Sequence, residues 1–524
     1  MVDFKTLLGD EGVTLETHPI KIFYNLDKES NIEGLRPSQE HILNNWVENF
    51  TDQKDTIIKL PTGQGKTLIG LLMLQTVLNQ DKEPVVYLCP TKYLVFQTIE
   101  QAKTFGIDAV QIGNDNRLPN DFLNSQAILV TTCKKLFNGK SQFGIAGSSR
   151  EEINLGALVM DDAHKCLEIV REAFSIRINK YYSDGEHNPA YKQFWSLFEH
   201  SLYDQASGTC LDISDGKNCH LAVPFWKWQA NLNNVLAILK ENKENNKSID
   251  FAWDLLKNNL GFCTCVISGL NIEITPRICP THLVPSFEKC QKRFFMSATL
   301  TEDSFLIKDL KIDPESVRKP LTYNELKYSG ERLILFPNLV DPELKYEDLI
   351  QWSSSNIGNN QKLGVVSIVP SNKKADKWVN YGAVKTNSTN LQHNVELLKQ
   401  QVNSGEADRV VVLLNAYDGI DLPDNTCRIL ILDSLPSYTS LYDQYMRNIR
   451  PESKLIRRQL AQRIEQGMGR AIRGSSDWCI VIVIGDDLAH FLSDSRKISY
   501  LSKEAQLQIK IGQDLADMMR KEGN

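Results

Sequence analysis

The sequence predicts an α/β protein with two parallel-sheet domains, and three observations support this prediction. Short apolar strands alternate with helical patterns before residue 165, and a second series of such strands begins at residue 293. A glycine-containing loop that ends in lysine joins the first strand to an apolar helix. The chain has 524 residues, of which 42% are hydrophobic, so several domains with buried cores can form.

The expected strands are short apolar runs that end in polar or glycine-containing turns. In the first domain they are TIIKL, VVYLC, AILVT, ALVMD and RFFMSAT, at residues 56–60, 85–89, 127–131, 157–161 and 293–299. In the second domain they are RLILF, GVVSIV, RVVVLL, RILILD and CIVIVI, at residues 332–336, 364–369, 409–414, 428–433 and 479–484. Runs of this kind are typical of strands that are buried on both faces.

The segment between the two strand series has a different composition and contains four of the eight tryptophans: Trp195, Trp226, Trp228 and Trp253. Apolar residues at 232, 235, 236 and 239 predict an amphipathic helix. Its aromatic side chains could stack on nucleic-acid bases, but helical spacing favours core packing. We expect an N-terminal extension at 1–30, a first domain at 31–165 and 291–322, an insertion at 166–290, and a second domain at 323–524.

The formal net charge is −6, so a surface for a polyanion must be a local patch. One basic segment runs from Tyr442 to Arg473 and carries Arg447, Arg450, Lys454, Arg457, Arg458, Arg463, Arg470 and Arg473 against three acidic residues. A solvated helix face and contact with phosphates both fit this segment.

Eleven cysteines in a chain with no visible leader predict reduced thiols rather than a disulfide framework. Six of them lie between residues 200 and 290, but only Cys263 and Cys265 are closely spaced, so a metal site there is a minor alternative. No apolar run approaches the roughly 18 residues of a membrane span. We expect a cytoplasmic protein without a membrane partner.

The loop at residues 60–67, LPTGQGKT, has the composition of a phosphate-binding loop. Gly63 and Gly65 allow backbone N–H groups to face phosphate oxygens, and Lys66 supplies a positive charge. The Thr67 hydroxyl can bind Mg²⁺ at the start of the following helix. A strict G-x-x-x-x-G-K-[ST] pattern has glycine where this chain has Leu60.

Two adjacent carboxylates, Asp161 and Asp162, follow the strand ALVM. They could act on a bound ion, or they could cap a helix and favour its dipole. Together with the phosphate loop, the sequences DDAH at 161–164, MSATL at 296–300 and QGMGRAIRG at 466–474 resemble the motifs of superfamily 2 helicases. The XPD and DinG branch is the most similar one. Gly419, Ile420 and Asp421 resemble its second-domain signature.

This resemblance implies a P-loop NTPase fold with two RecA-like domains and a largely helical, arch-like insertion in the first. It also implies roles for individual residues. The residues expected to bind ATP are Arg36, Gln39, Pro61, Thr62, Gly63, Gln64, Gly65, Lys66, Thr67, Gly419 and Asp421. Thr67 and Asp161 are expected to hold Mg²⁺, and Asp162 to position the attacking water. His164, Gln466, Arg470 and Arg473 complete the catalytic set, the two arginines reaching the phosphates from the second domain. Ser297 and Thr299 are expected to couple the domains, and Thr91, Lys92 and Thr132 to contact nucleic acid.

The chain also departs from its relatives. Only Cys89 and Cys133 lie between the phosphate loop and DDAH, so we expect no iron–sulfur cluster there. Asp162 and Asp418 stand where the relatives have glutamate. The predicted function is that of an ATP-dependent helicase or translocase on single-stranded nucleic acid, with DNA as first choice and 5′ to 3′ movement by resemblance. The alternatives are an RNA-dependent ATPase and a nucleotide-switched binding subunit, with weak unwinding, in a defence or repair complex with a protein partner.

Overall fold

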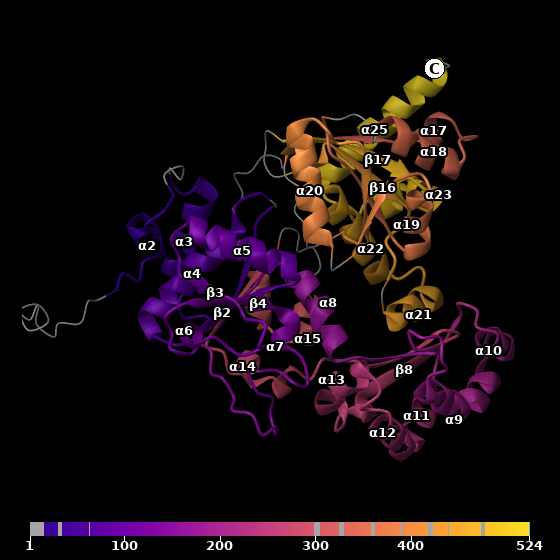
Figure 1. Ribbon diagram of the computed structural model, residues 1–524, viewed down its shortest axis with the longest axis horizontal. Coiled ribbons are helices and arrows are strands. Elements are labelled where there is room, and N and C mark those ends of the chain that lie inside the picture. The colour runs from indigo at the N-terminus through magenta and orange to yellow at the C-terminus, as the bar shows by residue number, and fades with distance from the viewer. Residues whose placement is uncertain are drawn as a thin grey trace, which may run out of the picture.

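The computed structural model describes residues 15–522 except 30–33, 62, 298–303, 324–329, 358–361, 388–389, 418–421, 423, 439 and 473–476. Three bodies are visible in Figure 1. We call them the first lobe (15–174 and 285–323), the insertion (175–284) and the second lobe (330–522). The α/β fold predicted from the sequence is confirmed.

The first lobe is built on a seven-stranded parallel sheet in the order β11-β1-β10-β5-β2-β4-β3. Its strands are β1 (Asp55–Lys59), β2 (Val85–Cys89), β3 (Ala109–Val110), β4 (Ile128–Thr132), β5 (Ala157–Met160), β10 (Lys292–Ser297) and β11 (Leu321–Thr322). The five predicted strands are all present. The two-residue strands β3 and β11 are too short to leave a pattern in the sequence.

Helices cover this sheet and enter the chain between its strands. They are α2 (Pro19–Asn25), α3 (Pro37–Asn49), α4 (Lys66–Asp81), α5 (Lys92–Thr104), α6 (Asn120–Leu123), α7 (Cys133–Leu136), α8 (Ala163–Ala173), α14 (Pro285–Glu288), α15 (Ser304–Leu310) and α16 (Pro314–Arg318). Ile22 and Phe23 of α2 are buried in the same core as α3 and α4.

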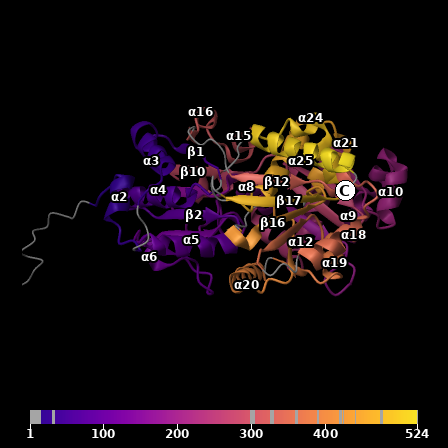
Figure 2. The same ribbon diagram turned by 90° about the horizontal axis from the view of Figure 1, so that it is seen from above.

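The second lobe repeats the architecture with a six-stranded parallel sheet in the order β12-β17-β16-β13-β15-β14. The strands are β12 (Glu331–Leu335), β13 (Val365–Val369), β14 (Val384–Thr386), β15 (Val410–Leu414), β16 (Ile429–Asp433) and β17 (Trp478–Ile484). The helices are α17 (Pro337–Val340), α18 (Tyr346–Trp352), α19 (Asn372–Val379), α20 (Leu391–Ser404), α21 (Leu441–Ile449), α22 (Lys454–Met468), α23 (Asp486–Ser493), α24 (Ser495–Ile498) and α25 (Lys503–Glu522). Figure 2 shows the two lobes side by side from above.

The insertion combines helices with a four-stranded antiparallel sheet that the sequence analysis did not predict. The helices are α9 (Pro189–Gln205), α10 (Ser207–Ser214), α11 (Phe225–Ala230), α12 (Leu232–Glu241) and α13 (Lys247–Leu256). The sheet has the order β6-β9-β8-β7, with β6 (Ile176–Asn179), β7 (His220–Ala222), β8 (Cys263–Ser268) and β9 (Asn271–Pro276). The β8–β9 hairpin turns at Gly269, where a Cβ atom would lie 2.4 Å from the Lys217 carbonyl oxygen.

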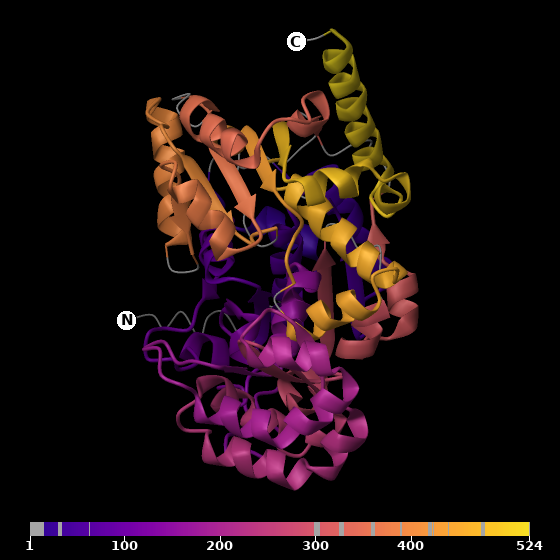
Figure 3. The ribbon, with the colours of Figure 1, turned by 90° about the vertical axis from the view of Figure 1, so that its right-hand side faces the viewer.

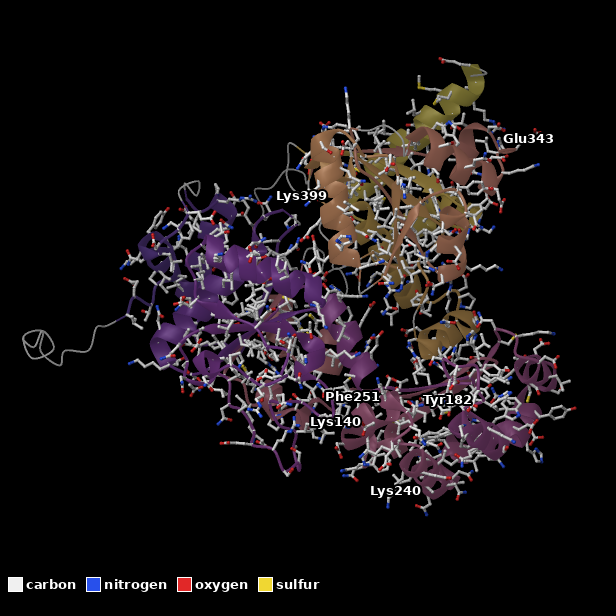
Figure 4. All side chains as sticks on the ribbon, in the orientation of Figure 1. Lys140, Tyr182, Lys240, Phe251, Glu343 and Lys399 are labelled. Atoms are coloured by element: carbon white, nitrogen blue, oxygen red, sulfur yellow. The ribbon has the colours of Figure 1, made fainter. Side chains whose placement is uncertain are left out.

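The core shows which bodies are packed together. One hydrophobic cluster runs from Leu158 on the first sheet to Leu255 and Ile267 of the insertion, whereas the second lobe has clusters of its own. Lys140 and Phe251, labelled in Figure 4, mark this junction: the Lys140 ammonium is 5.6 Å from the Phe251 ring centre. The insertion is therefore an extension of the first lobe. No helix among the described residues is long and apolar enough to cross a membrane.

Candidate active site

The phosphate-binding loop lies at the carboxyl end of β1, where it leads into α4. Gly65 is the residue before α4 and has φ +70°, and a Cβ there would lie 2.3 Å from the Gln39 amide nitrogen. Glycine is therefore required both by the backbone angle and by the neighbour. The Lys66 ammonium donates to the carbonyl oxygens of Leu60 and Pro61 at 3.0 and 3.1 Å, so it lies along the loop.

The beginning of α3 supports the loop from the side. The Gln39 amide donates to the Gly65 carbonyl at 3.1 Å and accepts from the Arg36 backbone N–H at 2.9 Å. The Arg36 guanidinium donates to the Gly63 carbonyl, and the Ser38 hydroxyl donates to the Gln64 side chain at 3.0 Å. Arg36 and Gln39 thus hold the loop backbone in place, and their approach to adenine stays a prediction.

Asp161 and Asp162 follow β5, which is separated from β1 only by β10. Because all three strands are parallel, their carboxyl ends bring Lys66, Asp161 and Ser297 to one edge of the sheet. Burial raises the pKa of Asp161 to about 6, although the Lys66 charge opposes the rise. Its carboxylate accepts from the Asp162 backbone N–H at 3.0 Å.

Tyr87 on β2 is a site residue that the sequence analysis missed. Its side chain is fully buried, and its hydroxyl has no hydrogen-bond partner among the described residues. Burial raises its pKa well above the usual value, and the neighbouring Asp161 charge adds to the rise. The signal available in the sequence was a single hydroxyl in the otherwise apolar strand VVYLC.

The donor set fits Mg²⁺. Asp161 supplies a buried carboxylate and Thr67 a hydroxyl at the start of α4, and the buried Tyr87 hydroxyl lies close enough to Asp161 for that charge to help raise its pKa. No group of three His, Cys, Asp or Glu side chains in the described part of the chain could enclose a metal by itself. Mg²⁺ commonly takes one or two protein carboxylates and completes its shell with phosphates and water.

Asp162 occupies the N-cap position of α8 without acting as a cap. Its side chain accepts no capping hydrogen bond, and its backbone has the left-handed angles φ 47° and ψ 66°. Non-glycine residues in that region cluster at functional sites. Its carboxylate oxygen lies 3.9 Å from the Arg470 guanidinium of the second lobe, which also donates to the Tyr417 carbonyl at 2.7 Å. The helix-capping interpretation therefore does not describe this side chain.

His164 on α8 joins the two lobes. Its Nδ1 is 3.2 Å from the Ser297 hydroxyl, and its Nε2 is 2.9 Å from the Gln462 amide nitrogen of α22. Because an amide nitrogen only donates, Nε2 accepts and the ring proton is on Nδ1, facing Ser297. The partner from α22 is thus Gln462, one helical turn before Gln466 of the predicted motif.

A second contact between the lobes lies one turn further along α8. The carboxylate of Glu168 pairs with the Arg463 guanidinium at 2.5 Å and with Lys165 at 2.8 Å. Burial would raise the pKa of Glu168, but the two cations lower it to about 2. The contact therefore carries its charges throughout the neutral and mildly acidic range.

The residues predicted to contact nucleic acid lie at the same edge of the first sheet. Thr91 precedes α5 and its hydroxyl accepts from the Leu94 backbone N–H at 3.2 Å, while Lys92 is exposed. Thr132 ends β4 and pairs in register with Cys89 at the end of β2. Adjacent parallel strands thus place Thr91 and Thr132 near each other.

The remaining predicted residues are placed as follows. Five of them lie outside the described residues: Thr62, Thr299, Gly419, Asp421 and Arg473. Of the basic segment, Arg463 and Arg470 face the first lobe, Arg457 pairs with Glu452, and Arg450 is exposed. Cys210, Cys263, Cys265, Cys279 and Cys290 are buried and Cys219 is partly exposed.

Two family models match parts of this chain. A family model described as "Type III restriction enzyme, res subunit" matches residues 32–184, and one described as "Helicase C-terminal domain" matches 357–496. No curated protein matches the sequence.

Three solved structures have similar folds. "XPD_APO" is 16% identical with a TM-score of 0.54, over 87% of this chain and 96% of that one. Xpd4 of S. tokodaii is 16% identical with a TM-score of 0.52, over 90% and 99%. "XPD_Helicase" is 15% identical with a TM-score of 0.55, over 90% and 98%.

Proposed function

Because the chain belongs to the superfamily 2 helicases and has an XPD-like fold, we propose that it hydrolyses ATP to move along a single strand of nucleic acid. The proposed substrate is DNA, with 5′ to 3′ movement. Both details rest on the resemblance of the motifs to those of XPD and DinG relatives. RNA is the alternative strand.

The observation that carries this proposal is the approach of Arg470 to Asp162. The two side chains come from different lobes, yet their charged atoms are 3.9 Å apart beside Lys66 and Asp161. An arginine that enters a phosphate site from a second lobe is the arrangement by which such ATPases stabilise the transferred phosphoryl group. A purely structural ion pair would not explain its position next to the phosphate loop.

Each residue then has a role in hydrolysis. Lys66 leaves the loop carbonyls to bind the β and γ phosphates, and Arg470 turns from Asp162 to the same oxygens. The freed Asp162 carboxylate orients the attacking water and takes part of its proton. Bound by Thr67 and Asp161, Mg²⁺ would neutralise phosphate charge.

The contacts between the lobes connect this site to movement. His164 contacts both Ser297 on the first sheet and Gln462 on α22, so it links the two lobes. Glu168 binds Arg463, which also lies on α22. When the γ phosphate is lost, Arg470 loses its ligand and α22 is released from α8. Closure with ATP and opening after hydrolysis then shift a bound strand past the residues at the edge of the first sheet.

The test is ATP hydrolysis measured with and without single-stranded DNA or RNA. We expect stimulation by the strand, and we expect Lys66→Ala to remove nearly all turnover. Lys103→Ala, which deletes an exposed lysine near the end of α5, is the matched control and should hydrolyse ATP at the wild-type rate. A Lys66→Ala enzyme with unchanged stimulated turnover would contradict the site assignment.

Strand displacement on duplexes with 5′ or 3′ tails separates direction and substrate. Displacement from the 5′-tailed DNA duplex is expected, and displacement only from RNA-containing duplexes would favour the RNA alternative. One observation favours a nucleotide-switched binding protein: Asp162 is one methylene shorter than the glutamate of the relatives. That function predicts strand affinity that depends on ATP without stimulated turnover.

A further inference from the structure

Helix α11 of the insertion presents two aromatic side chains to solvent. Trp226 is 70% exposed and Phe225 is 54% exposed. Trp228, on the opposite face of the same helix, is buried, and its indole N–H donates to the Leu260 carbonyl at 2.8 Å. Trp228 thus serves the core, whereas the exposure of Trp226 and Phe225 has no explanation in the packing of the insertion.

These aromatic residues line a groove of about 930 Å³ between the insertion and α21 of the second lobe. Its charged lining residues are four cations and one carboxylate: Lys227, Arg277, Lys308, Arg450 and Asp204. The Arg277 guanidinium lies 5.7 Å from the centre of the Phe225 ring. In a chain with a net charge of −6, this excess of cations is local and matches a polyanion.

The groove is continuous with the contact between the lobes. A second cavity, of about 520 Å³, is bounded by α8, β9 and α22 and is lined by His164, Glu168 and Gln462. The two cavities share five lining residues: Arg277, Lys308, Tyr442, Met446 and Arg450. A flexible polymer that leaves the space between the lobes can therefore pass directly to Trp226.

The walls of the groove belong to the insertion and to the second lobe, and a polar contact at the start of α21 joins these two parts. The carboxylate of Glu273 on β9 is 2% exposed and accepts from the Ser440 hydroxyl at 2.6 Å and the Leu441 N–H at 3.0 Å, at the start of α21. Figure 3 shows the insertion directly beneath the second lobe. Because the insertion shares its core with the first lobe, movement of the lobes changes the width of this groove.

We propose that this groove binds single-stranded nucleic acid outside the space between the lobes, with bases stacked on Trp226 and Phe225. The phosphates pair with Arg277, Lys308 and Arg450. This inference rests on the proposed function, because it extends the path of the same strand. A volume of about 930 Å³ lies at the upper end of the range for small-ligand pockets and accommodates one or two nucleotides.

Two features select a single strand as the occupant. Aromatic faces stack on unpaired bases, whose faces a duplex does not offer. Cations beside those rings suit a chain of phosphates, and the stacking of a base needs no particular sequence. An acidic protein could pair with the cations, but it would gain less binding energy than a single strand from the two exposed rings beside them.

The test measures binding of a labelled strand of about 16 deoxythymidines to the full-length protein. Trp226→Ala is expected to weaken binding by about 5- to 150-fold, the usual effect of one lost stacking platform, and Trp226→Phe to restore most of it. Arg277→Glu is expected to weaken binding and to reduce the salt dependence of log K by roughly 0.7 or more. Thermal melting confirms that each variant is folded.

Matched controls lie on the second lobe, away from the groove. Trp352→Ala removes another half-exposed indole, and Lys399→Glu reverses the charge of an exposed residue on α20 (Figure 4). Both are expected to bind like wild type. Wild-type affinity in folded Trp226→Ala and Arg277→Glu proteins would overturn the proposal and leave the ATPase assignment standing. A wild-type protein that binds no strand at all would instead overturn the proposed function, and this inference with it.

Discussion

The contact between His164 and Gln462 leads to the sharpest prediction. Gln462→Ala removes the amide donor that α22 directs at the Nε2 of His164, at 2.9 Å, while leaving the phosphate loop untouched. Gln462 is 7% exposed, so water replaces the lost donor only partly. The variant should therefore loosen the closed arrangement of the lobes without changing the groups that bind ATP.

The expected magnitude follows from the chemistry of the contact. A hydrogen bond between neutral groups contributes about 0.5–1.5 kcal/mol, which corresponds to roughly a 2- to 13-fold change in an equilibrium. If closure limits turnover, the strand-stimulated kcat should fall by about fivefold. The KM for ATP should change by less than about twofold, because uniform binding of the nucleotide is unaffected.

The assay is steady-state ATP hydrolysis at saturating ATP with increasing single strand, arranged as a double-mutant cycle. The cycle pairs His164→Ala with Gln462→Ala, and a second cycle pairs His164→Ala with Gln466→Ala. The first should show an interaction energy of about 1 kcal/mol, and the second should be additive within roughly 0.5 kcal/mol. An additive first cycle together with a coupled second one would show that the motif residue, not Gln462, is the partner of His164.

Three further predictions follow from the same structure. Burial raises the pKa of Asp161 to about 6, so below that pH a proton competes with Mg²⁺ for its carboxylate. The affinity for Mg²⁺–ATP should therefore fall about tenfold per pH unit between pH 6 and 5, as measured by binding of a fluorescent nucleotide. Because the pKa of Asp161 is higher in the folded state, its ionisation should lower the free energy of unfolding as the pH rises from 3.8 to about 6. An affinity for Mg²⁺–ATP that does not change with pH would show that this pKa is not raised and would refute both expectations. Asp162→Glu keeps the charge and adds reach toward the water, so the stimulated kcat should be at least as high as in the wild type, and a tenfold loss would contradict the role given to this carboxylate. Glu273→Gln removes the charge that accepts hydrogen bonds at the start of α21, and this loss should destabilise the helix by about 1 kcal/mol. Amide exchange in residues 441–445 should then be about fivefold faster. Unchanged exchange would show that the contact does not stabilise the helix.

Most of the nucleotide site could be predicted from the sequence because it is assembled from local segments. Lys66 and Asp161 follow strands of one parallel sheet and Ser297 ends another strand of it, and the carboxyl ends of such strands necessarily meet at one edge. Arg470 was predicted from its motif, although its distance from Asp162 depends on how the lobes pack. The helicase family and the two α/β domains followed from the same motifs.

Other parts of the site could not be predicted, because they depend on which surfaces meet. Helical spacing indicates that Gln462 and Gln466 share a face of α22, but it does not say which of them lies opposite His164. The antiparallel sheet of the insertion was missed because its outer strands β6 and β7 are short and its β8–β9 hairpin is bounded by a weak turn signal, SGLN.

The amino-acid sequence by itself determined the chemistry of this protein: a phosphate loop, two carboxylates and an arginine from a second domain, in an order that parallel sheets convert into one site. Only the tertiary structure decided the contacts between segments far apart in the chain. These are His164 with Gln462, Glu273 with α21, and the exposure of Trp226 beside a buried Trp228. Local patterns determine which residues share a face, but a contact forms only where two separately folded surfaces pack against each other.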